Sequence, residues 1–170
     1  GVKPRSVNRK LSAVKTFFNY LNKIEAVNGN PAKKIRGPKT PKKLPAFVHH
    51  EEMTRVIDDE QAYPDNFEGE RDRFIMELFY VTGMRKSELI GIKNSDVDNY
   101  AKTLRVTGKR NKQRIIPLSD TTVVKLKKYV ELRNREIENK TPYLFVKKNG
   151  DPIYPKMIYN IVRKHLDSIP

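Results

Sequence analysis

A basic, proline-rich stretch from about residue 30 to residue 46 constrains the fold of this chain more than any other feature. Its four prolines are Pro31, Pro38, Pro41 and Pro45. Proline lacks an amide donor and favours extended backbone in the residue before it, so no helix or central strand continues through this stretch. We therefore predict a helical part over residues 1–29, a stiffened linker over 30–46 and a second, larger domain over 47–170.

An amphipathic helix is predicted over residues 6–24, before the linker. Apolar side chains recur there at helical spacing: Val7, Leu11, Val14, Phe17, Phe18, Leu21 and Ile24. A single helix of this kind needs a partner surface for its apolar side. No second helix precedes it, so we expect the chain to begin inside a domain whose earlier part is absent.

After the linker the hydrophobic period changes from helical to alternating and back. Helices are predicted over 50–61, 70–82, from Lys86 onward, from Ser119 or Asp120 to about Ile137, and over about 155–167. Paired strands are predicted over 103–106 and 114–118, with a short strand-like run over 143–146. The expected core positions include Val81 and Val124. The fold class is therefore mainly α with a small antiparallel β-hairpin or sheet (α+β).

The charge of the chain favours a polyanionic partner. Lys and Arg number 35 against 20 Asp and Glu, for a net charge of +15. Residues 1–45 and 101–170 are strongly basic, whereas 46–100 are net acidic, so the excess is concentrated rather than spread. This pattern favours nucleic-acid binding, with an RNA- or ribosome-associated protein, or a merely basic one, as the alternatives.

Two classes of protein are disfavoured by composition. No apolar run approaches the length needed to span a bilayer, so we expect no membrane partner. The chain contains no cysteine, which rules out disulfides and thiolate metal sites and fits a reducing cytoplasm.

The first candidate site is Thr82-Gly83-Met84-Arg85-Lys86-Ser87-Glu88-Leu89, where one helix should end and another begin. Arg85 and Lys86 fall at the start of the second helix, where the helix dipole already favours negative charge. A phosphate bound there would accept hydrogen bonds from backbone amides and from a guanidinium. The alternative is that Arg85 is solvated or paired with Glu88.

The second candidate site is the turn of the predicted hairpin. It carries three cationic side chains, Lys109, Arg110 and Lys112, with Arg114 nearby at the start of the second strand. A narrow basic projection of this kind can enter a DNA groove and place an ammonium beside one backbone oxygen, and neighbouring cations favour proton loss from a lysine. An ordinary solvated basic turn is the alternative.

Taken together, these segments resemble the tyrosine recombinase (phage integrase) family, particularly its Xer-type members. The family pattern T-G-x-R-x-S-E-L matches residues 82–89, and G-K-x-x-K-x-R-x-x-P-L matches residues 108–118, downstream of a basic linker. The resemblance implies that Arg85 and Lys109 are catalytic. This sequence departs from the family pattern at Arg110, where Xer-type sequences usually have glycine.

The resemblance also implies a mechanism and a division of roles. In the implied mechanism, a tyrosine attacks a DNA phosphodiester and forms a 3′-phosphotyrosine intermediate. Arg85 binds the phosphate, and Lys109 protonates the leaving oxygen. Glu88 positions the helix that carries the arginine. Residues 1–29 would be the last helix of a core-binding (SAM-like) domain, and 47–170 the N-terminal part of the catalytic domain. The implied DNA contacts are Lys42, Lys43, Lys86, Arg110, Lys112 and Arg114. The implied partner is double-stranded DNA, bound by a homotetramer of the intact enzyme, with no cofactor and no metal.

The family's H-x-L-R-H segment and its tyrosine nucleophile are not found in these residues. Ser168 stands where an arginine would follow His165, so His165 is predicted to lie on the surface of the last helix, and Tyr154 and Tyr159 are predicted to pack rather than react. His49 and His50 are assigned to a helix start rather than to a metal. We therefore expect a fragment, cytoplasmic and of bacterial or phage origin, that binds DNA without cleaving it as a monomer or weak dimer. A catalytically silent DNA-binding module is the alternative.

Overall fold

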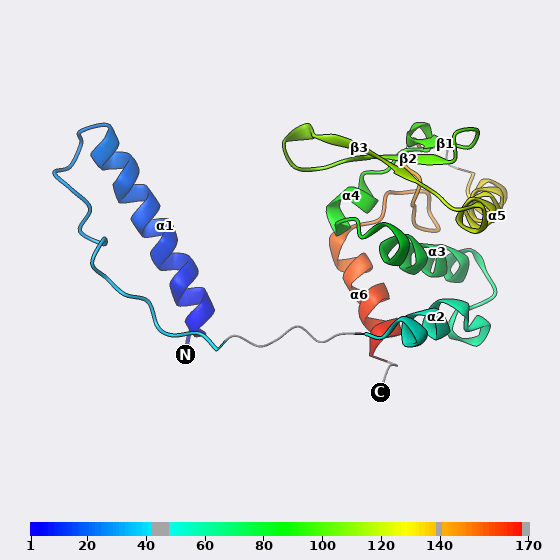
Figure 1. Cartoon of the computed structure of the whole chain (residues 1–170), viewed down its shortest axis with the longest axis horizontal. Coiled ribbons are helices and arrows are strands. Elements are labelled where there is room, and N and C mark those ends of the chain that lie inside the picture. Colours follow the sequence, from blue (N-terminus) through cyan, green and yellow to red (C-terminus); the bar gives the residue numbers. More distant parts are fainter. Residues whose placement is uncertain (42–47, 139–140, 168–170) are drawn as a thin grey trace. The chain divides into compact units, whose positions relative to one another are not determined.

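The computed structural model describes residues 1–41, 48–138 and 141–167. The chain separates into two compact units, Gly1–Phe47 and Val48–Pro170 (Figure 1). Lys42 and Lys43, both predicted to contact DNA, lie outside the described residues. Within the described residues, no helix combines the length and the apolar character needed to cross a bilayer.

The first unit consists of helix α1 (Pro4–Lys23) and a segment that folds back along it. The amide of Asn30 donates to the Asn19 side chain at 2.7 Å and to the Lys15 carbonyl at 3.0 Å. The Asn8 amide donates to the carbonyl of Pro38 at 2.9 Å. These bonds attach the start of the proline-rich stretch to α1. The apolar face of the helix stays largely open, with Phe17 57% exposed.

The second unit contains five helices of more than three residues and one small sheet among its described residues. In chain order the elements are α2 (His50–Asp58), η1 (Glu60–Ala62), α3 (Phe67–Thr82), α4 (Lys86–Ile90), η2 (Asn94–Asp96), β1 (Val97–Asp98), β2 (Thr103–Thr107), η3 (Lys109–Asn111), β3 (Gln113–Pro117), α5 (Asp120–Glu136) and α6 (Pro155–Leu166). The sheet is antiparallel with the order β1-β2-β3, so the predicted α+β class is confirmed. The run over 143–146 makes two isolated bridges instead of a strand.

Helix α3 lies at the centre of this unit, in contact with α2 and α5, while α4 contacts β2 and α6 (Figure 1). The ring of Tyr129 on α5 is fully buried among the rings of Phe67, Phe74 and Phe145. Its hydroxyl donates to the carbonyl of Leu144 at 3.0 Å, which satisfies the polar end of a buried aromatic side chain.

Two predicted core positions are wrong. Val81 is 50% exposed and Val124 is 66% exposed. Val124 directly follows the buried Val123, and consecutive helical residues point about 100° apart, so Val124 points to solvent. Val81 follows Tyr80, which is itself 41% exposed, on the solvent side of α3.

The surface position predicted for His165 is also wrong. The residue is 4% exposed, and its ring stacks on the ring of Tyr63 with the centroids 4.2 Å apart. Ile158, Ile161 and His165 recur at intervals of three and four, so the buried stripe of α6 includes the histidine. Tyr154 and Tyr159, predicted to pack, are instead about half exposed, at 50% and 47%.

Burial of His165 predicts a loss of stability at mildly acidic pH. The pKa of His165 lies below its ordinary value of 6.5, mainly because the ring is buried and to a smaller extent because Lys164 is charged nearby. The folded chain therefore binds a proton at His165 less readily than the unfolded chain does. The free energy of unfolding should therefore fall as the pH drops below about 6.5. Urea titrations at pH 7.5 and 5.0 measure the change, and His165→Gln should reduce it. An equal pH dependence in both proteins would contradict the assignment.

Candidate functional site

The corner between α3 and α4 places Arg85 at the surface. Gly83 ends α3 with φ of 58°, a left-handed conformation that glycine adopts without steric cost. Met84 and Leu89 are buried on either side of Arg85 and fix the corner. Helix α4 has five residues, so its dipole is small, and positive charge at its start comes mainly from the side chain of Arg85, which is 75% exposed.

Glu88 is the buried centre of this corner. Its side chain is 2% exposed, and its carboxylate accepts three hydrogen bonds. They come from the Arg85 amide at 2.9 Å, Arg85 Nη1 at 3.0 Å and Arg114 Nη2 at 2.8 Å. The hydrogen bond from Arg114 has the largest effect on the pKa of Glu88, and the hydrogen bond from the Arg85 amide has the next largest. Together they lower this pKa to about 2, so the carboxylate is charged at neutral pH.

The register of the hairpin explains why Arg114 reaches Glu88. Arg114 on β3 pairs with Val106 on β2, and paired residues of antiparallel strands project from the same face of the sheet. Val106 is buried, so Arg114 projects from the covered face, beside α4. The neighbouring pair, Arg105 with Ile115, projects from the other face, where Ile115 is 69% exposed.

The turn of the hairpin lies directly beside the same carboxylate. A methyl group added to Gly108 would lie 2.9 Å from Glu88 Oε1, so glycine permits this close approach. The Gly108 amide donates to the carbonyl of Lys112 at 2.7 Å and closes the loop. Lys109, the next residue, is exposed, and its backbone begins at the edge of the Arg85–Glu88 cluster.

The turn is unusual in its backbone. Arg110 and Asn111 both have positive φ, 60° and 58°, in the left-handed region that favours glycine. Arg110, which stands where Xer-type sequences usually have glycine, therefore adopts a backbone conformation that costs glycine least, and its cationic side chain is exposed.

The predicted residues thus divide into three groups. Arg85, Glu88 and Arg114 form one hydrogen-bonded cluster, with Gly108 against it. Lys109, Arg110 and Lys112 are exposed on the adjoining turn. Lys86, predicted as a DNA contact, is exposed and also lines an apolar pocket. Sequence reasoning missed that Arg114 pairs with Glu88, because this depends on the strand register and on where α4 packs.

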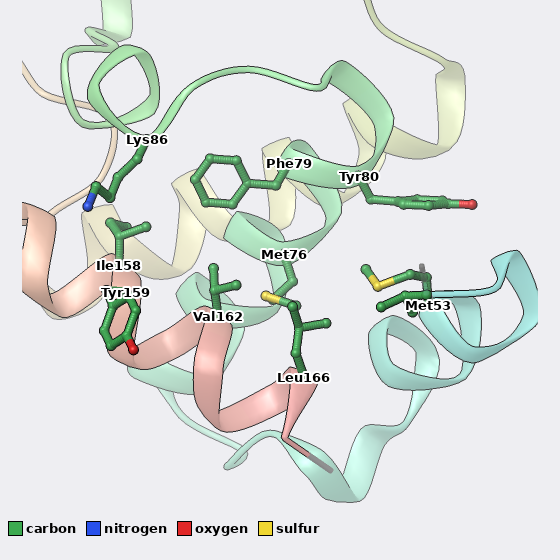
Figure 2. A pocket seen from close by; sticks show the side chains of 10 residues that line it. Met53, Met76, Phe79, Tyr80, Lys86, Ile158, Tyr159, Val162 and Leu166 are labelled. Carbon is green, nitrogen blue, oxygen red and sulfur yellow. The ribbon is translucent and has the colours of Figure 1, made fainter. Parts of the chain in front are cut away.

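The apolar pocket has a volume of about 400 Å³ and lies between α3 and α6, with Met53 of α2 at one side (Figure 2). Phe79, Tyr80 and Met76 line it from α3, while Ile158, Tyr159, Val162 and Leu166 line it from α6 (Figure 2). Its lining offers few polar groups for chemistry. Among the described residues, no cluster of three histidine or acidic side chains is positioned to hold a metal.

Comparison with known sequences identifies clear relatives. A model of the phage integrase family matches residues 46–168. The tyrosine recombinase XerC of Chlorobaculum tepidum is 33% identical over 99% of this chain and 56% of its own length. The tyrosine recombinase XerC of Staphylococcus carnosus is 37% identical over 90% of this chain and 51% of its own length. The chain therefore spans about half the length of the curated relatives it matches.

Solved structures show the same fold. The XerH site-specific recombinase bound to its difH substrate, in a pre-cleavage complex, superposes with a TM-score of 0.73 at 21% identity, over 98% of this chain and 49% of that one. A λ integrase dimer bound to a COC′ core site superposes with a TM-score of 0.66 at 19% identity, over 92% of this chain and 43% of that one. At these identities the likeness establishes the architecture.

Proposed function

Because this chain belongs to the phage integrase family of tyrosine recombinases, we propose that it binds duplex DNA and supplies part of the catalytic site of a site-specific recombinase. The observation that carries the proposal is the cluster at Glu88. There, one buried carboxylate holds the exposed guanidinium of Arg85 beside the turn that begins at Gly108. A phosphate approaching this corner would meet Arg85 and the turn lysine together.

The proposed reaction is a transesterification at phosphorus. A tyrosine hydroxyl of the intact enzyme attacks the phosphodiester, forming a 3′-phosphotyrosine bond and breaking the bond between phosphorus and the 5′ oxygen. Arg85 stabilises the negative charge that builds on the non-bridging oxygens, for which a planar and permanently charged donor is suited. Lys109 donates a proton to the leaving 5′ oxygen. Attack by another strand's 5′-hydroxyl reverses the step and joins the strands.

The proposed domain assignment follows the family. Residues 1–29 would be the last helix of a core-binding domain, 30–46 the interdomain linker and 47–170 the first part of the catalytic domain. Lys42, Lys43, Lys86, Arg110 and Lys112 would contact phosphates. We propose that the intact enzyme acts in the cytoplasm of a bacterium, as a homotetramer on DNA, and that the 170-residue chain alone is a monomer or weak dimer.

The 170-residue chain should bind duplex DNA without becoming attached to it. Binding by lysine and arginine releases counterions, so the logarithm of affinity should fall with the logarithm of salt by about 0.9 per phosphate neutralised. Fluorescence anisotropy with a labelled duplex at several salt concentrations measures this slope. Structured RNA of equal length serves as the competitor, because an RNA-binding protein would prefer it.

Denaturing gels after incubation with a nicked duplex test for attachment. A covalent adduct would contradict the expectation that this chain lacks the nucleophile. Loss of the adduct in Tyr154→Phe or in Tyr159→Phe would identify that tyrosine as the nucleophile, and an adduct that persists in both variants would assign it to another residue of this chain. Stronger competition by RNA than by duplex DNA would contradict the proposed substrate. Binding without an adduct is also what a catalytically silent DNA-binding module would show, so only a cleavage assay of the intact enzyme separates that alternative.

A further inference from the structure

Two arginines share the carboxylate of Glu88 in an unequal way. Oε1 accepts from Arg85 Nη1 at 3.0 Å, whereas Oε2 accepts from the Arg85 amide at 2.9 Å and from Arg114 Nη2 at 2.8 Å. Arg85 therefore commits one guanidinium nitrogen to the glutamate. Its side chain is 75% exposed, so the remaining donors lie at the surface.

Arg114 differs from the other basic residues of the hairpin in its surroundings. It projects from the covered face of the sheet with Val106, and its guanidinium is held at the buried glutamate. Lys109, Arg110 and Lys112 are exposed on the turn itself. A guanidinium bound to a buried carboxylate is suited to holding structure, because moving it to a DNA phosphate would leave the carboxylate with one partner fewer in a desolvated position.

We propose that Arg114 is a positioning residue, which occupies one oxygen of Glu88 so that Arg85 keeps its guanidinium available for the DNA phosphate. This inference rests on the proposed function of Arg85. It assigns Arg114 to orienting the catalytic arginine, in place of the direct DNA contact that its charge and its position on β3 beside the turn predict.

The physical reason is competition for the carboxylate. An arginine and a carboxylate that have no other partners favour a bidentate pair with two parallel hydrogen bonds. Without Arg114, Oε2 would lose its side-chain partner, and Arg85 would gain by turning a second guanidinium nitrogen toward Glu88. That movement would withdraw donors from the phosphate, and a displacement of about 1 Å is enough to slow catalysis by about a hundredfold.

Arg114 also attaches the lysine turn to α4. A methyl group added to Gly108 would lie 3.9 Å from Arg114 Nη1 and 2.9 Å from Glu88 Oε1, so the backbone just before Lys109 packs against both partners of the ion pair. The same ion pair therefore fixes the strand that follows the turn to the helix that carries Glu88. Loss of Arg114 would loosen the position of Lys109 relative to Arg85.

The test separates DNA binding from cleavage in the proposed full-length enzyme. Affinity, salt dependence of affinity and the single-turnover cleavage rate at saturating DNA are measured for Arg114→Ala on a nicked suicide duplex. A positioning role predicts a cleavage rate lowered by about tenfold to a hundredfold, with an unchanged salt slope. Arg114→Lys should recover part of the cleavage rate, because it keeps a cation beside Glu88. If the alanine variant folds poorly, the lysine variant is compared with the unmodified enzyme in its place.

Arg105→Ala is the matched control. Arg105 lies on the same sheet, is 46% exposed against 42% for Arg114, and pairs with Asp96 at 3.0 Å, away from Glu88. It should cleave at the normal rate. If Arg114→Ala instead cleaves normally at saturation but loses about 0.9 from the salt slope, Arg114 is a phosphate contact and the inference is wrong.

The same series tests the proposed function separately. If Arg85→Ala abolishes cleavage while Arg114→Ala behaves like Arg105→Ala, the inference about Arg114 fails and the role of Arg85 stands. If Arg85→Ala cleaves normally, the proposed function itself fails.

Discussion

Cleavage by the proposed full-length enzyme should fall about a thousandfold when Arg85 is replaced by alanine, whereas affinity for the DNA site should change by less than tenfold. A donor directed at developing charge contributes about 3–4 kcal/mol to the transition state, and much less to the ground state, in which the phosphate carries less charge on its non-bridging oxygens. Single-turnover cleavage of a nicked suicide duplex gives the rate, and anisotropy gives the affinity.

Arg85→Lys should restore only part of the lost rate. Lysine keeps the positive charge but has a compact ammonium, so it does not reproduce two parallel donors on one phosphate while also bonding to Glu88. The buried carboxylate would still be charged at neutral pH, since Arg114 and the amide of residue 85 would continue to bond to it. Full cleavage by Arg85→Ala, with a normal thermal unfolding curve, would remove this residue from the mechanism.

Much of the fold followed from hydrophobic period and turn residues. The helix predicted over 70–82 is present as α3, and it ends at Gly83 as the left-handed preference of glycine predicts. The hairpin was predicted from alternation in 103–106 and 114–118, and β2 and β3 contain both runs apart from Leu118. Local signals of this kind are strong because they depend on residues close together in the chain.

The predictions that were wrong concern residues whose structure depends on contacts with residues far away in the sequence. The run over 143–146 is continuously apolar, like a buried strand, yet its partners are single residues, Lys93 and Pro152, so only bridges form. His165 is predicted on the surface because Ser168 stands where an arginine would follow it in the family motif, although Ile158 and Ile161 precede it at buried spacing. The ring of Tyr63, about a hundred residues earlier in the chain, covers it.

The candidate site shows the same division between local and distant information. Two motifs selected Arg85, Glu88 and Lys109, but neither motif reveals that Arg114 reaches Glu88. That contact requires the register that pairs Arg114 with Val106 and the packing of α4 beside β2. A side chain that looks like a DNA contact in the sequence can therefore be committed to an internal ion pair.

Lys109→Ala should lower the cleavage rate of the proposed full-length enzyme by about a hundredfold or more, because general acid catalysis contributes about 10²–10⁴ to such a step. Lys112→Ala is the matched control. It removes a cation from the same exposed turn, and it should reduce affinity and the salt slope while leaving the rate at saturating DNA nearly unchanged. Equal effects of the two substitutions on the rate would indicate a general electrostatic contribution of the turn.

A change of leaving group separates proton donation by Lys109 from phosphate binding. With sulfur in place of the bridging 5′ oxygen, the departing thiolate needs no proton, because a thiol has a pKa of about 8.5 whereas that of water is about 15.7. The Lys109→Ala enzyme should therefore cleave this substrate at nearly the rate of the unmodified enzyme. Arg85→Ala should gain nothing from the same substrate, since charge on the non-bridging oxygens still lacks its donor. If sulfur rescues neither variant, or rescues both equally, Lys109 is not the proton donor, and the exposed turn beside Glu88 acts through its charge alone.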